Sequence, residues 1–78
     1  MRIRKKAAKA LAKMPKRTAA AFFTAFEKIE SGKPGKLDVR RLSGVEGFRL
    51  RIGRYRALYT HELEVIVIDA GPRGGIYK

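Results

Sequence analysis

The spacing of the apolar residues changes once along this chain of 78 residues, close to Gly35. Before that point apolar side chains recur every three or four residues, which is the period of an amphipathic helix. The pattern predicts one helix over residues 5–14 and a second from residue 16 to about 31, with Pro15 between them. Residues 31–35 contain two glycines and a proline, so they end the second helix. The first half of the chain is therefore predicted to form a helical hairpin.

After Gly35 apolar and polar residues alternate, and β-branched and aromatic residues become frequent, which is typical of strands. The pattern predicts strands over residues 37–42, 47–52, 55–60 and 63–69. Gly53-Arg54 and His61-Glu62 have the length of two-residue hairpin turns, so the simplest topology is an antiparallel meander. Amphipathic helices need an apolar surface to pack on. We therefore expect one α+β domain over residues 1–78, with the helical hairpin packed on one face of a small, mainly antiparallel twisted sheet.

A turn at Gly53-Arg54 also fixes which residues lie opposite each other in the hairpin that it joins. Arg51 then pairs with Arg56, and both lie on the same face as Arg49. The other face is apolar and would cover the helices; its residues are Phe48, Leu50, Ile52, Tyr55, Ala57 and Tyr59. Like charges directly opposite each other destabilise a sheet, so we expect an anionic group between the two arginines.

A two-residue turn at His61-Glu62 has a similar consequence for the last strand. It would place Val65 and Val67 beside Leu58, on the same face as the arginines. That face would then be partly cationic and partly aliphatic, which suits a phosphate backbone or an amphipathic protein segment. His61 itself is predicted to be an exposed turn residue at the far end of the hairpin from Arg51 and Arg56.

The charge of the chain is strongly unbalanced, with 19 lysines and arginines against 7 acidic residues and a formal net charge of +12. Such a field attracts polyanions, so the candidate partners are nucleic acid, an anionic membrane surface and an acidic protein. Residues 1–17 contain eight basic residues and no acidic one. We expect the lysines of the first helix to contact RNA; they are Lys5, Lys6, Lys9 and Lys13.

Several classes of protein are disfavoured by what the sequence lacks. There is no cysteine, so the fold uses neither disulfides nor thiolate metal sites and suits a reducing compartment. No apolar stretch has the length of a signal peptide or membrane span, so we expect a cytoplasmic protein with no membrane partner. One histidine and seven scattered carboxylates offer no cluster of metal ligands. Neither a metal nor another cofactor is expected.

Three segments follow the helical hairpin in a recognisable order: Arg41-Leu42-Ser43-Gly44, then FRLRIGRYRALY at residues 48–59, then GPRGGIY at residues 71–77. This ordered set resembles the RelE/ParE superfamily of toxins from toxin–antitoxin systems. The resemblance covers most of the chain, and its most specific part is RLRIGRYRALY followed, after one strand, by an arginine four residues before a tyrosine. It also implies a short first strand at about residues 1–4.

The resemblance implies an activity and a set of residues for it. RelE-like toxins cut mRNA in the ribosomal A site, where the 2′-hydroxyl of the RNA attacks the adjacent phosphate. The implied catalytic residues are Arg51, Arg56, Arg73 and Tyr77, and the implied RNA contacts on the hairpin are Arg49 and Arg54. Relatives often carry lysine where this chain has Arg49 or Arg51, and arginine does not give up its proton. We therefore expect these two arginines to hold phosphates and Tyr77 to accept the proton.

Three functions remain open from the sequence. The first is a metal-independent, ribosome-dependent mRNA endonuclease that inhibits translation, which the basic set with its terminal tyrosine favours. The second is a ParE-like inhibitor of DNA gyrase with no catalytic residues of its own. The third is a nucleic-acid-binding module without catalysis, which would leave RNA intact. A toxin of this kind implies a small acidic antitoxin as partner in a hetero-oligomer, besides mRNA and the ribosome.

Overall fold

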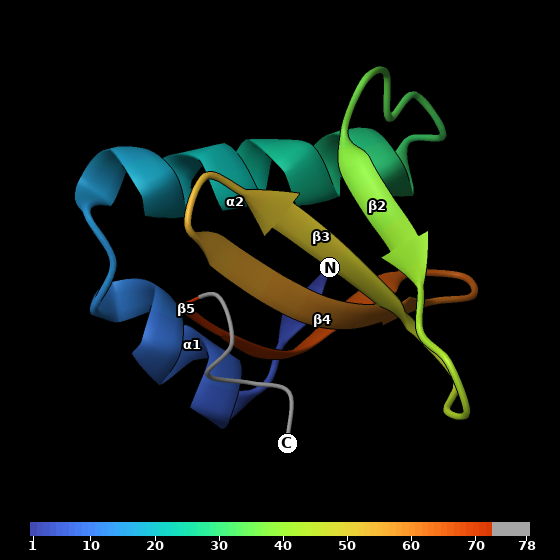
Figure 1. Cartoon of the computed structure of the whole chain (residues 1–78). Helices are drawn as coiled ribbons and strands as arrows, with labels where there is room; N and C mark the ends of the chain where they lie inside the picture. Colours follow the sequence, from blue (N-terminus) through green and yellow to red (C-terminus); the bar gives the residue numbers. More distant parts are fainter. Residues whose placement is uncertain (73–78) are drawn as a thin grey trace.

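The computed structural model describes residues 1–72 of the chain. Its strands form one sheet. Within that range the sheet has five strands in the order β1-β5-β4-β3-β2. Strands β2 to β5 form an antiparallel meander, and the short β1 lies parallel to β5 at the edge. Both helices pack on one face of the sheet (Figure 1). The elements are β1 Arg2–Ile3, α1 Lys5–Ala12, α2 Lys16–Glu30, β2 Asp38–Arg41, β3 Phe48–Ile52, β4 Tyr55–His61 and β5 Val65–Pro72.

The helical hairpin has the predicted form. Helix α1 ends at Ala12, two residues before the predicted end, but Met14 is still buried against the core. Pro15 precedes α2, where its fixed φ of −53° suits the entry to a helix. The C-terminus of α2 falls at Glu30, before the glycine-containing segment. The predicted α+β fold class is confirmed.

The core lies between the helices and the sheet and is built around aromatic rings. Phe26 is fully buried, and its ring meets that of Tyr59 edge to face at 5.4 Å between centroids. The ring of Phe48 also stacks on that of Tyr59, at 5.4 Å between centroids. Ring contacts of this kind add to the free energy that comes from burying apolar area. Helix α2 is therefore fixed to β3 and β4 mainly through Phe26 and its neighbours.

The hairpin of β3 and β4 has the predicted register. Arg51 pairs with Arg56, Leu50 with Ala57, and Ile52 with Tyr55 across the turn. Gly53 has a φ of 59°, a left-handed conformation that glycine adopts without the strain of a Cβ atom. Leu50 and Ala57 are fully buried under the helices, so the arginines that alternate with them lie on the opposite face.

The connection from β4 to β5 differs from the prediction. His61 pairs with Val65, so three residues, 62–64, join the strands instead of the predicted two. Because one extra loop residue reverses the side on which every later residue lies, Val65 and Val67 point into the core and are fully buried. The prediction that these two valines lie on the same face of the sheet as the arginines was wrong. His61 is also not an exposed turn residue, because it ends β4 and is half-buried.

Strand β5 contains a bulge that compensates for this change. Tyr59 pairs with Val67 and Leu58 with Asp69, so Ile68 has no partner on β4. One extra residue in a strand reverses the alternation a second time. Ala70 consequently lies opposite Ala57 and is buried with it. The neighbouring Asp69 forms an ion pair with Lys6 at 3.2 Å.

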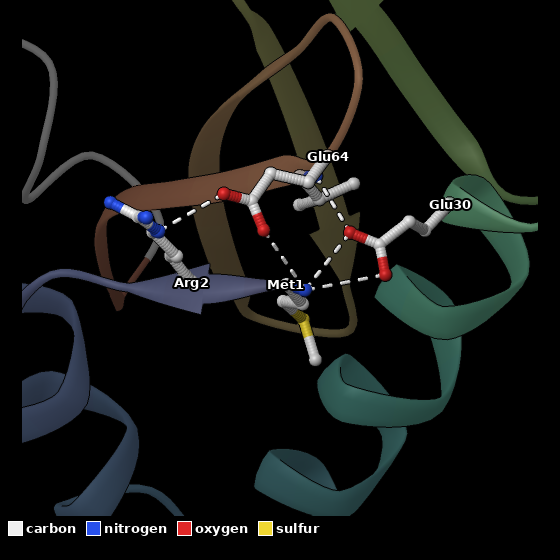
Figure 2. A network of polar contacts seen from close by, with 5 residues as sticks. Met1, Arg2, Glu30 and Glu64 are labelled. Atoms are coloured by element: carbon white, nitrogen blue, oxygen red, sulfur yellow. Dashed lines mark hydrogen bonds and ion pairs between the residues drawn. The ribbon is translucent and has the colours of Figure 1, made fainter.

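A group of polar contacts, which we call the Glu30 network, joins the end of α2 to the start of β5 (Figure 2). The Glu30 carboxylate accepts a hydrogen bond from the backbone N–H of Val65 at 2.8 Å, and it lies 3.1 Å from the amino group of Met1. Glu64 lies 3.6 Å from the same amino group and 3.0 Å from Nε of Arg2. The Val65 N–H and then the amino group of Met1 lower the pKa of Glu30. The hydrogen bond to Glu30 is the main cause that raises the pKa of the amino group.

Two phenylalanines of α2 give a direct test of the core. Phe26 is fully buried, whereas Phe23 is 37% exposed on the same helix. Phe26→Ala should lower the free energy of unfolding by about 3–5 kcal/mol, because it removes a buried ring and leaves a cavity. Phe23→Ala should lower it by about 1 kcal/mol or less. Urea unfolding followed by circular dichroism measures both, and equal losses would contradict the described packing.

The Glu30 network predicts a dependence of stability on pH. A carboxylate whose pKa is lowered by folding stabilises the protein above its unfolded pKa, and this contribution disappears as the pH falls through the folded pKa. The melting temperature at about pH 6 should therefore be higher for the wild type than for Glu30→Gln, and the difference should shrink as the pH falls below about 4.3, the ordinary pKa of glutamate. The exposed Glu27 of α2 provides a matched control in Glu27→Gln. A difference between wild type and Glu30→Gln that stays constant from pH 6 to pH 3 would argue against the network.

Candidate functional site

The face of the sheet opposite the helices carries a cluster of arginines from three adjacent strands. We call this cluster, with the acidic residue inside it, the arginine face; its members are Asp38, Arg40, Arg49, Arg51 and Arg56. Strand register places them together, because Asp38 pairs with Arg51, Arg40 with Arg49, and Arg51 with Arg56. Val39 between the two β2 members packs against the core. The predicted grouping of Arg49, Arg51 and Arg56 on one face is confirmed.

A single carboxylate connects two of these arginines. Oδ1 of Asp38 accepts a hydrogen bond from Nη2 of Arg49 at 2.8 Å, and Oδ2 lies 3.0 Å from Nε of Arg51. The carboxylate thus bridges two guanidinium groups that stand two residues apart on β3. Asp38 lies on β2, on the other side of Arg51 from Arg56, so it is not the anionic group expected between that pair, and the expectation stays a prediction. With four arginines and one aspartate, the face retains a formal charge of +3.

The two bridged arginines differ in their surroundings. The Arg49 side chain is 11% exposed and its Nε is buried without a hydrogen-bond partner, whereas the Arg51 side chain is 39% exposed. The ion pair of Arg51 is made at Nε, and more than a third of its side chain remains exposed to solvent. Guanidinium groups fixed in this way can bind phosphate oxygens in pairs. Arg49 therefore contributes mainly charge and support, and Arg51 offers the more accessible donors.

The lysines of α1 form a second basic surface at another edge of the sheet. Lys6, Lys9 and Lys13 line a hollow of about 510 Å³ together with Tyr55 and the end of β5. Lys5 begins the same helix and is exposed. Tyr55 is half-buried and directly precedes Arg56 in β4, so the hollow adjoins the strand that carries this arginine.

The other residues singled out from the sequence lie apart or outside the described range. Arg54 is exposed in the turn at the end of the β3–β4 hairpin. His61 ends β4 at the opposite end of the strand from Tyr55, where it lines a hollow of about 640 Å³ with Glu62 and Glu64. Arg73 and Tyr77 lie outside residues 1–72, as does the arginine–tyrosine spacing on which the resemblance partly depends. Among residues 1–72, no three potential metal ligands stand close enough together to hold a metal ion.

Sequence reasoning missed two members of the arginine face, Asp38 and Arg40. The strand over residues 37–42 was predicted, and its alternation already places the two side chains on the same side. Its register with the next strand could not be predicted, because residues 42–47 do not form a tight two-residue turn. In the structure the Leu42 N–H donates to the carbonyl of Gly47 and closes a longer loop.

A membrane surface was one of the partners that the charge alone left open. The helices of residues 1–72 include none with the length and apolar character that a membrane span needs.

Comparison with known proteins bears on the class of this protein. No family model and no curated protein matches the sequence. Two solved structures share its architecture of two helices on a mainly antiparallel sheet. A chain from the RelB–RelE antitoxin–toxin complex of Methanococcus jannaschii aligns with a TM-score of 0.82 and 22% identity, over 99% of this chain and 95% of that one. A chain from the RelBE2 toxin–antitoxin complex of Mycobacterium tuberculosis aligns with a TM-score of 0.71 and 26% identity, over 92% and 94%.

By its architecture, the protein is therefore a small α+β protein with two helices on one face of a mainly antiparallel open sheet. More specifically, it has a RelE-like fold, and the resemblance inferred from the sequence is confirmed at the level of the fold.

Proposed function

We propose that this chain is the toxin of a toxin–antitoxin pair and that it cleaves mRNA on the ribosome. The observation that carries the proposal is the gathering of Arg49, Arg51 and Arg56 on one sheet face by strand register. The RelE-like fold supports the same conclusion, because two toxin–antitoxin complexes share it over nearly the whole chain. Arginines concentrated on an open surface suit an extended phosphate backbone.

The proposed chemistry uses the substrate as its own nucleophile. The 2′-hydroxyl of the RNA loses its proton and its oxygen bonds to the adjacent phosphorus, while the bond from phosphorus to the 5′-oxygen breaks. The leaving 5′-oxygen takes up a proton, and the other fragment ends in a cyclic phosphate. Negative charge builds up on the nonbridging oxygens during this step, and fixed guanidinium groups stabilise it.

The roles within this reaction follow from the chemistry of each side chain. Arg51 and Arg56 face each other across the hairpin and would hold the reacting phosphate between them. A guanidinium keeps its proton at neutral pH, so neither arginine serves as the base. Tyr77 is the proposed proton acceptor and Arg73 the proposed third source of positive charge, both on the strength of the family resemblance. Lys6, Lys9 and Lys13 would hold RNA outside the reacting step.

The cleavage proposal predicts cut messages at defined codon positions when the protein is added to translating ribosomes. Arg56→Ala and Arg73→Ala should each slow cleavage by about 10²–10³-fold, because each removes a charge that the transition state needs. Arg17→Ala, which changes an exposed arginine at the start of α2, should leave the rate unchanged. Mapping of mRNA ends measures the effect. Intact messages together with inhibited gyrase would favour the ParE-like function, and RNA binding without cuts would favour the non-catalytic module.

The proposed partner is a small acidic antitoxin. An amphipathic acidic segment laid on the arginine face would neutralise a surface that is otherwise strongly positive, and the net charge of +12 favours such a partner. We expect a short acidic protein encoded by a neighbouring reading frame to co-purify with this chain and to restore growth when both are expressed. Growth curves with and without the neighbouring frame measure this. High yield of this chain alone in growing cells would contradict toxicity.

A further inference from the structure

Asp38 is the acidic member of the arginine face, and its placement differs from that of a scattered surface charge. It lies on β2, directly opposite Arg51 and diagonal to Arg49. Each of its two oxygens contacts a different guanidinium, at 2.8 Å and 3.0 Å. The carboxylate therefore uses both oxygens to fix the distance and relative orientation of two arginines.

For the contact between Asp38 and Arg51, exposure argues against a role limited to stability. The Asp38 side chain is 40% exposed and that of Arg51 is 39% exposed. Ion pairs this accessible to water contribute little to the folded state, because water and salt screen them. The same contact has a large effect on geometry, since a long arginine side chain that is free in solution samples many rotamers. An arginine already held in one orientation loses less freedom when it binds a phosphate.

The choice of nitrogen atoms supports the same view. The contact of Asp38 with Arg51 is made at Nε, at 3.0 Å, and the Arg51 side chain remains 39% exposed. On Arg49 it takes Nη2, and this fixes a side chain whose Nε is already buried. The contact thus holds both arginines while part of the Arg51 side chain stays accessible to a ligand.

We propose that Asp38 is a positioning residue that orients Arg49 and Arg51 toward a phosphate of the bound RNA. This inference rests on the proposed function, because it assigns to Asp38 a part in the same cleavage step. The carboxylate also carries a cost for binding, since it removes one positive charge from the surface that attracts RNA. Asp38 therefore weakens general attraction to RNA and improves the alignment of the groups that stabilise the transition state.

The two effects of Asp38 can be separated by substitution. Asp38→Asn removes the charge, and its amide presents one oxygen and one NH₂ group, so it can accept from only one of the two arginines. Asp38→Ser removes the carboxylate without placing an NH₂ group beside a guanidinium. Asp38→Glu keeps the charge and both oxygens on a longer side chain. Glu27→Gln on α2 removes one negative charge away from the arginine face and controls for net charge.

The experiment measures cleavage and binding separately for the full chain. Cleavage is followed in a single turnover on ribosomes programmed with mRNA, at saturating protein. Binding is followed with a single-stranded RNA whose 2′-oxygens are methylated, so that it cannot be cut, at several salt concentrations. Thermal melting by circular dichroism establishes that each variant is folded, and Asp38→Ser replaces Asp38→Asn if the amide prevents folding.

We expect Asp38→Asn to cleave at least about tenfold more slowly while binding the methylated RNA as tightly as the wild type or more tightly. The dependence of log K on log salt should become steeper, by up to about 0.7, if one more phosphate contact is made. Asp38→Glu should recover part of the rate at the wild-type salt dependence. Glu27→Gln should leave the cleavage rate unchanged.

Two results would overturn the positioning role. One is a folded Asp38→Asn or Asp38→Ser variant that cleaves at the wild-type rate. The other is a loss of affinity as large as the loss of rate, which would mean that Asp38 only maintains the surface. Wild-type protein that leaves the mRNA intact is a different outcome, because it refutes the proposed function and with it the role of Asp38.

Discussion

The tight turn at Gly53-Arg54 decides where most functional side chains of this protein lie. It aligns β3 with β4 so that residues of the same kind stand opposite each other, Leu50 with Ala57 and Arg51 with Arg56. One face of the hairpin can then bury apolar side chains under α2, while the other collects guanidinium groups. A shift of one residue in this pairing would send arginines into the core and leave the helices without a surface to pack on. Folding and the basic site therefore depend on the same register.

This dependence explains how much of the molecule could be predicted from the sequence. The helices, the sheet and the β3–β4 pairing follow from apolar spacing and a glycine-containing turn, both of which are local signals. The β4–β5 connection was predicted with the wrong length because His61-Glu62 has no glycine or asparagine that would require a two-residue turn. Burial of Val65 and Val67 is determined by the core, which local residues do not reveal. Asp38 was missed for a related reason, since its partner strand lies beyond a loop whose length sets no register.

The arginine face is a compromise between folding and binding. Like charges gathered on adjacent strands repel one another, and this repulsion opposes the compact state. Asp38 reduces it without covering the surface, because its carboxylate lies among the arginines at the edge of the cluster and leaves Arg51 accessible. The lysines of α1 add charge at a separate edge, where Lys6 pairs with Asp69. The arginine face and the lysines of α1 are thus two separate basic surfaces, one on the strands of the sheet and one on a helix.

The bulge at Ile68 has a consequence for how chains with this fold can vary in length. Val67 and Ala70 are three positions apart, and in a regular strand they would lie on opposite faces. Because Ile68 bulges between them, both side chains reach the core. Deletion of Ile68 would remove the bulge and make the pairing of β4 with β5 regular, with Val67 and Ala70 two positions apart and still facing the core. Deletion of Ile66 would instead make Val65 and Val67 neighbours, so that only one of them could face the core. Ile68 is therefore the position in β5 at which a homologous chain could lose one residue and keep its buried side chains.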